Sequence, residues 1–130
     1  MPELKELECK IYVDADGSRE ELAKRLAMLL SAPLQGTTLS VPCGEIDVRR
    51  NDEFDETQRL EFPDGFLYFR FLVEIYTDNP GTPHCSHVVV QILEYFWAQG
   101  LAAVAACDYE EDLPNGGGYR SQSIPWPAVP

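Results

Sequence analysis

The chain has 130 residues, 45% of them hydrophobic and 11% aromatic, which is enough for one folded domain and too few for two independent ones. It carries 22 acidic and 10 basic residues, for a net charge of −12. Nucleic acid and anionic membranes would be repelled by this charge, so neither is expected as a direct partner. The polar, acidic first residues do not resemble a secretory signal, and no run of about 18 apolar residues predicts a transmembrane helix. We therefore expect a cytoplasmic protein.

The first predicted elements are a strand and a helix. Residues 7–13 alternate between apolar and polar side chains, as in a half-buried strand. Ser18 and Glu21 have the spacing of a capping box, which predicts that a helix begins there. Leucines then recur at helical spacing until Pro33, where the helix must end.

Two further extended segments are predicted in the middle of the chain. Residues 37–51 form the first, and Pro42 and Gly44 within it indicate a bulge or an edge position. A polar, acidic connector follows. Residues 66–77 alternate most clearly of all and predict a strand with Leu67, Phe69, Phe71, Val73 and Ile75 on one face.

A second helix and a last strand complete the predicted elements. Thr82 is the expected N-cap and Pro83 the first residue of the helix, which should end at Gly100. Its apolar face is predicted to consist of Val89, Ile92, Leu93 and Phe96. Residues 101–107 form a short, continuous apolar run that is typical of a buried strand.

The predicted order is β-α-β-β-α-β. The simplest α+β arrangement for it is a ferredoxin-like sandwich, a four-stranded antiparallel sheet with two helices on one face. The other, open face should then carry Lys10, Tyr12, Glu45, Asp47, Arg49, Tyr68, Arg70, Glu74 and Tyr76. We expect residues 1–113 to form this domain and the Gly/Pro-rich residues 114–130 to form a loose tail.

The four cysteines are widely separated, and none forms a C-x-x-C pair. Cys9 and Cys107 lie in apolar, strand-like runs, where a free thiol behaves as a small hydrophobic group. Because disulfides are rare in the cytoplasm, we expect Cys43 and Cys85 to be free as well.

The segment "PHCSH" is the best candidate for catalytic or metal chemistry. His84 and His87 could supply two zinc ligands, and Cys85 a nucleophile, but no further ligand has suitable spacing. The chain also lacks a P-loop, a dinucleotide fingerprint and a nucleophile elbow. We therefore expect no cofactor, no metal and no enzyme activity. The alternative is a metal-dependent enzyme that uses these three residues with the carboxylates of 108–112.

Ten carboxylates are concentrated in residues 52–64 and 108–112. A partner rich in lysine and arginine would relieve their mutual repulsion and associate faster, whereas the alternative is a pair of solvated loops. The interpretation as a docking surface predicts these charged and aromatic contact residues: Asp52, Glu53, Asp55, Asp108, Tyr109, Glu110, Glu111, Asp112, Tyr119 and Trp126.

Three stretches carry a family resemblance: "EIDVRRNDEFD" (45–55), "FLYFRFLVEIY" (66–76) and "LEYFWAQGLAAVAACDYEEDLPNGGGY" (93–119). They resemble a family of small bacterial proteins with a W-x-x-G-h-x-A-V-A-A-C-D-[YF]-E-x-x-L-P segment. This resemblance covers about the last two-thirds of the chain and implies no particular activity.

In size, acidity and lack of catalytic motifs, the chain is also similar to the small immunity proteins of bacterial toxin–immunity systems. That similarity implies a protein that binds a cognate, basic toxin, such as a nuclease, and blocks its active site. A third alternative is a small homo-oligomeric ligand-binding or regulatory domain, such as a homodimer, whose copies pair through an edge or the open face of the sheet.

Overall fold

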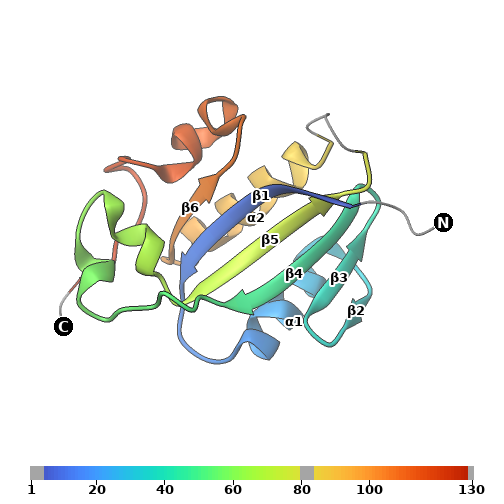
Figure 1. Ribbon diagram of the computed structural model, residues 1–130, viewed down its shortest axis with the longest axis horizontal. Helices are drawn as coiled ribbons and strands as arrows, with labels where there is room; N and C mark the ends of the chain where they lie inside the picture. Colours follow the sequence, from blue (N-terminus) through green and yellow to red (C-terminus); the bar gives the residue numbers. More distant parts are fainter. Residues whose placement is uncertain (1–4, 80–83, 129–130) are drawn as a thin grey trace.

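The computed structural model describes residues 5–79 and 84–128. It is an α+β fold in which two helices cover one face of a six-stranded, fully antiparallel sheet (Figure 1). The strands are β1 (Glu6–Asp14), β2 (Leu34–Gln35), β3 (Thr38–Val41), β4 (Gly44–Arg50), β5 (Phe71–Thr77) and β6 (Ala102–Ala106), in the order β2-β3-β4-β5-β1-β6. The helices are α1 (Arg19–Leu30) and α2 (Ser86–Ala98). Neither has the length and apolar character needed to cross a membrane.

β1 lies inside the sheet, between β5 and β6. Its alternating sequence places Cys9, Ile11 and Val13 in the core beneath the helices, where each is at most 1% exposed. Lys10 and Tyr12 point to the opposite face. The predicted half-buried strand is therefore confirmed.

Both predicted helices are present, with local causes at their ends. The Ser18 hydroxyl accepts a hydrogen bond from the Glu21 N–H at 3.2 Å and so caps α1. α1 ends at Leu30, and Ser31 takes the left-handed conformation that closes the helix. The expected apolar face of α2 is completely buried. The predicted N-cap at Thr82 and first turn at Pro83 lie outside the described residues.

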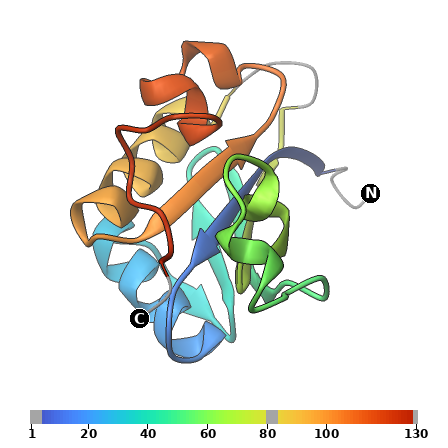
Figure 2. The same cartoon turned by 90° about the vertical axis from the view of Figure 1, so that its left-hand side faces the viewer.

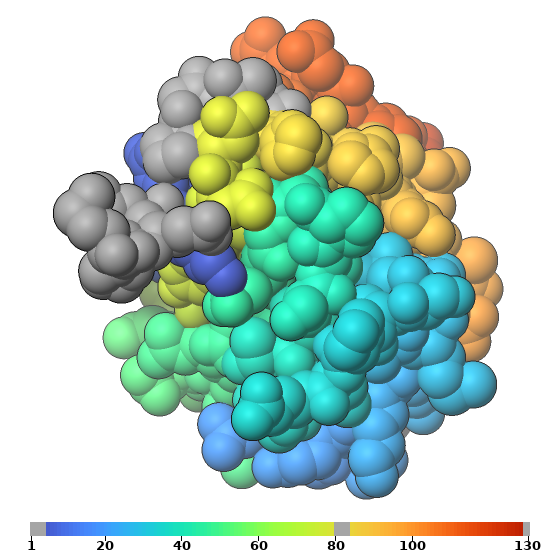
Figure 3. All heavy atoms as spheres, turned by 90° about the vertical axis from the view of Figure 1, so that its right-hand side faces the viewer, coloured from blue at the N-terminus to red at the C-terminus, as the bar shows by residue number. Residues whose placement is uncertain are grey.

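The sheet has six strands rather than the four that we expected. Residues 37–51 do not form one bulged strand, because the chain reverses at Pro42 and Cys43 and pairs β3 with β4. A Cβ atom on Gly44 would overlap the carbonyl oxygen of Tyr76, so only glycine fits where β4 meets β5. β2 pairs with β3 at the far edge of the sheet, and this hairpin lies beside α1 (Figure 3).

The predicted strand at residues 66–77 begins only at Phe71, because Asp64–Tyr68 forms a short 3-10 helix. The buried amide of Asn51 donates hydrogen bonds to the carbonyls of Leu67, at 2.9 Å, and Phe69, at 2.8 Å. These bonds hold the segment away from the strand ladder. Phe69 is therefore buried on the open face of the sheet and not beside Phe71, so that part of the prediction is wrong.

Residues 114–128 are not a loose tail. Ile124 is 7% exposed and completes a second apolar cluster with Phe69, Ala102 and Val104. The Trp126 indole N–H donates to the carbonyl of Leu60 at 3.0 Å. The open face thus acquires its own small core, built from residues 51–70 and the end of the chain (Figure 2).

Candidate functional site

The uncovered part of the open face contains a cavity of about 450 Å³. Its floor is formed by β1, β4 and β5, and its wall by residues 51–53 and by the end of the 3-10 helix Asp64–Tyr68. The lining residues are Lys10, Tyr12, Arg49, Arg50, Asn51, Asp52, Glu53, Leu67, Tyr68, Leu72 and Glu74. Of the open-face residues that we expected, Tyr68 and Arg70 lie before β5 rather than within it.

Glu74 is the charged centre of this cavity and is only 4% exposed. The Arg49 guanidinium donates a hydrogen bond to it at 3.1 Å, and the Tyr76 hydroxyl donates one at 3.3 Å. Burial and the Glu74 carboxylate raise the pKa values of Tyr12 and Tyr76, so both phenols stay protonated and can act as donors. The charges of Glu74 and Arg49 offset each other, so this pair adds no net charge to the floor.

A second cavity, of about 350 Å³, adjoins the first at Leu67, which lines both. Asp64 from the first acidic segment and Glu110 from the second lie on its walls. The Tyr119 hydroxyl donates a hydrogen bond to Asp64 at 2.9 Å and holds the end of the chain there. The two acidic segments therefore meet in space, which could not be deduced from the sequence.

The predicted contact residues divide into two groups. Asp52 and Glu53 are exposed beside the first cavity, and Asp108 and Glu111 are exposed in the loop after β6. Asp112 lies apart from these, in a shallow cavity of about 330 Å³ that also contains His87. The carboxylates are therefore on the surface but are not one cluster.

The remaining predicted contacts have structural roles. The Asp55 carboxylate accepts hydrogen bonds from the N–H groups of Gln58 and Thr57, at 2.8 and 2.9 Å, and these bonds lower the pKa of Asp55. The ring of Trp126 packs against Phe62 and Phe69. Their polar groups are already satisfied within the chain.

Leu67 is the feature of the site that sequence reasoning missed. It is 43% exposed, although the alternation of residues 66–77 predicted that it would lie in a strand, on the same face as Phe71 and Val73. The signal that could have found it is Asp64–Gly65, a turn-forming pair directly before the aromatic run.

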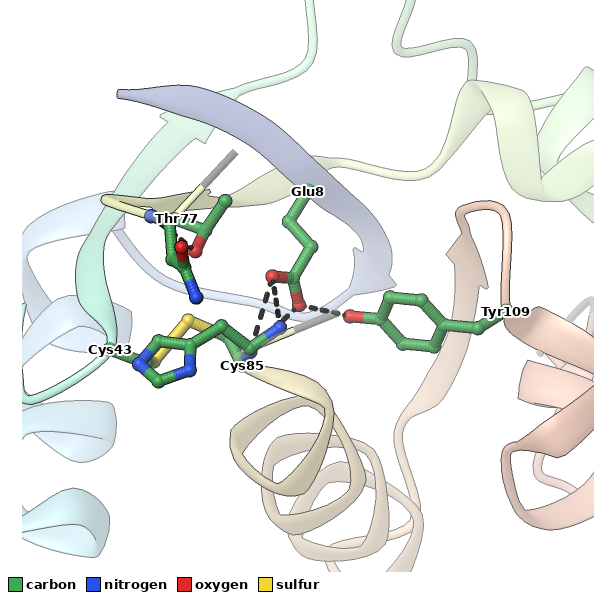
Figure 4. Close-up of a disulfide and its surroundings, with 7 residues drawn as sticks. Glu8, Cys43, Thr77, Cys85 and Tyr109 are labelled. Carbon is green, nitrogen blue, oxygen red and sulfur yellow. Dashed lines mark hydrogen bonds between the residues drawn. A yellow bond between two sulfur atoms is a disulfide. The ribbon is translucent and has the colours of Figure 1, made fainter. Parts of the chain in front are cut away.

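Cys43 and Cys85 form a disulfide, with their Cα atoms 5.5 Å apart (Figure 4). The expectation of four free cysteines is therefore wrong. The hairpin turn before β4 brings Cys43 beside the start of α2. Because the two cysteines are 42 residues apart in the sequence, this tertiary contact could not be predicted from local patterns. Since Cys85 has no free thiol, it cannot be the nucleophile of the alternative enzyme.

Histidines and carboxylates near this disulfide do not form a metal site in the described part of the chain. There, no group of three His, Cys, Asp or Glu side chains is placed to hold an ion. His84 and His87 are both exposed. The alternative of a metal-dependent enzyme thus gains no support from the geometry.

Glu8 connects the same region to the loop after β6. Its carboxylate accepts hydrogen bonds from the backbone N–H groups of His84, at 2.9 Å, and Cys85, at 3.0 Å, and from the Tyr109 hydroxyl (Figure 4). Burial and the bond to Glu8 raise the pKa of Tyr109. Tyr109, a predicted partner contact, is therefore engaged inside the protein.

Comparison with protein-family models, curated proteins and solved structures finds no match to this chain. Function therefore has to be inferred from the cavities, carboxylates and cysteines described above.

Proposed function

We propose that this chain is a non-catalytic binding protein that docks a basic protein on the surface around Leu67. This surface, called the Leu67 surface below, consists of Asp52, Glu53, Asp64, Leu67, Glu110 and Tyr119. The observation that supports the proposal is the meeting of two acidic segments, far apart in sequence, around one exposed leucine.

The composition of the Leu67 surface favours a protein over a small ligand. Protein interfaces combine an apolar or aromatic centre with a polar rim, and here Leu67 and Tyr119 form the centre and carboxylates the rim. The two adjoining hollows are open and shallow enough to receive side chains of a partner.

The charge of the Leu67 surface favours a basic partner. Four of its six residues are acidic, and the whole chain has a net charge of −12, which would accelerate encounter with a cationic protein. The first cavity also carries Lys10, Arg49 and Arg50, which balance Asp52, Glu53 and Glu74 there, so the acidic excess of the Leu67 surface comes from Asp64 and Glu110.

We further propose a toxin as the partner, inhibited in the way that immunity proteins inhibit theirs. The similarity in size, acidity and single-domain build supports this step. The strand order β4-β5-β1-β6, with both helices on one face, supports a ferredoxin-like sheet extended by the hairpin of β2 and β3. Because disulfides persist in oxidising compartments, we propose such a compartment for the encounter instead of the cytoplasm expected from the sequence.

Co-expression with the product of the neighbouring gene tests the proposal. If that product is toxic, the wild type should protect the cells and bind it. The double variant Asp52→Asn/Glu53→Gln and the variant Leu67→Ala should each weaken binding about tenfold, a loss of about 1.4 kcal/mol, when affinity is measured by calorimetry.

Asp16→Asn/Glu94→Gln is the matched control, since it removes two exposed charges from other parts of the molecule. It should leave the affinity unchanged. A neighbouring product that is neither toxic nor bound, or equal binding by all four proteins, would disprove the proposed function.

A further inference from the structure

The two cysteines outside the disulfide face each other across neighbouring strands. In the antiparallel pair of β1 and β6, Ile11 lies opposite Ala105 and Lys10 opposite Ala106. Continued one residue past the end of β6, the same register puts Cys107 opposite Cys9. Opposite residues of antiparallel strands have Cα atoms about 4.5–5.5 Å apart, which lies within the range that a disulfide spans.

The two thiols also influence each other's ionisation. The Cys9 thiol donates a hydrogen bond to the carbonyl oxygen of Lys10 at 3.7 Å, and the mutual influence of the two thiols raises the pKa of Cys9 and lowers that of Cys107. Burial raises the pKa of Cys9 further, and the backbone N–H of Tyr109 helps to lower that of Cys107. The pair is therefore asymmetric, with the thiolate favoured on Cys107.

Solvent access also favours reaction at Cys107 over reaction at Cys9. Cys9 is 1% exposed, within the core below the helices, whereas Cys107 is only partly buried, just after the end of β6. An external reagent can therefore reach Cys107 first. Cys9 can then attack the mixed disulfide that has formed on Cys107.

We propose that Cys9 and Cys107 are a redox-active dithiol that low-molecular-weight disulfides oxidise to a second intramolecular disulfide. This site adjoins the Leu67 surface, since the Glu110 carboxylate accepts a hydrogen bond from the Cys107 N–H at 3.2 Å, but its chemistry does not depend on the proposed docking function. It also differs in kind from Cys43–Cys85, since its two sulfurs are unbridged and one of them is accessible.

The reaction follows ordinary thiol–disulfide exchange. The Cys107 thiolate attacks one sulfur of the external disulfide, which breaks that S–S bond and expels one thiolate. The Cys9 thiol then loses its proton, and its sulfur attacks the Cys107 sulfur of the mixed disulfide, expelling the second thiolate. The protein gives up two electrons and two protons, and the external disulfide is reduced to two thiols.

Incubation of the folded, full-length protein with oxidised glutathione tests the proposal. After alkylation of the remaining thiols, a non-reducing peptide map of the wild type should show a Cys9–Cys107 cross-link beside Cys43–Cys85. Cys9→Ala should accumulate glutathione on Cys107, whereas Cys107→Ala should leave Cys9 unmodified. Alkylation of Cys107 in the first variant should be on the order of tenfold faster than that of Cys9 in the second.

The wild-type map decides the question even if a variant fails to fold. A stable mixed disulfide on Cys107, or two thiols that stay reduced in excess oxidised glutathione, would overturn the proposal. Cross-linking that occurs only after denaturation would overturn it too, since it would place the two sulfurs too far apart in the native protein.

Discussion

Glu8 is the residue whose side chain joins three separate segments. It projects from β1, accepts two N–H groups at the start of α2 and receives the hydroxyl of Tyr109 from the loop after β6. A carboxylate at a helix N-terminus is also favoured by the helix dipole. Because its bonds are charge-assisted, Glu8 should contribute more than a neutral acceptor would.

Replacing Glu8 should therefore destabilise the fold. We expect Glu8→Ala to lower the free energy of unfolding by about 2–3 kcal/mol, because two backbone donors and a half-buried hydroxyl lose their acceptor. Urea denaturation measures the change. Glu6→Ala, at an exposed position of the same strand, is the control and should stay within about 0.5 kcal/mol of the wild type. Equal effects at both positions would contradict the role of Glu8.

Among the elements, the C-terminal segment differs most from what the sequence predicted, because it packs against β6 on the open face of the sheet. Ile124→Ala should lower the free energy of unfolding by about 2–3 kcal/mol, because the side chain fills the cluster with Phe69 and Val104. Thermal or urea unfolding provides the measurement. Met28→Ala, at a side chain that is 82% exposed, should change almost nothing. If Ile124→Ala proved equally neutral, the segment would not be part of the core.

The elements that could be predicted are those whose causes are local. Ser18 caps α1, the periodicity of residues 89–96 defines the buried face of α2, and the alternation in β1 matches its two environments. Nothing local distinguishes Phe69 from Phe71, because the alternating pattern runs through both. Their different faces are decided by Asn51, a residue distant in sequence.

The candidate site was predictable to a similar degree. Charge runs identified the two acidic segments, since composition is a local property. Their contact with each other depends on the path of residues 51–70 across the sheet, whereas the exposure of Leu67 had a local signal in the turn-forming pair Asp64–Gly65. The pairing of Cys43 with Cys85 likewise depends on tertiary structure.

For the whole molecule, the Cys43–Cys85 disulfide ties the sheet to α2. Closing a loop of 42 residues should stabilise the protein by about 4 kcal/mol through the unfolded chain. The variant Cys43→Ala/Cys85→Ala should therefore unfold at a lower urea concentration than the oxidised wild type. The wild type in a strong reductant should match the variant. A reductant that has no effect on the wild type would show that the disulfide contributes nothing to its stability.

The interior position of β1 has a consequence for how the protein is made. Its two partners, β5 and β6, lie more than 55 residues downstream, at residues 71–77 and 102–106. At about 5–20 residues per second, a ribosome needs on the order of 5–20 s to travel from the end of β1 to the end of β6. Both edges of β1 lack a partner until β5 has been made, and the edge that pairs with β6 stays open until the end of that interval. Sheet closure must therefore be a late event, and the nascent chain should depend on chaperones that shield its first strand.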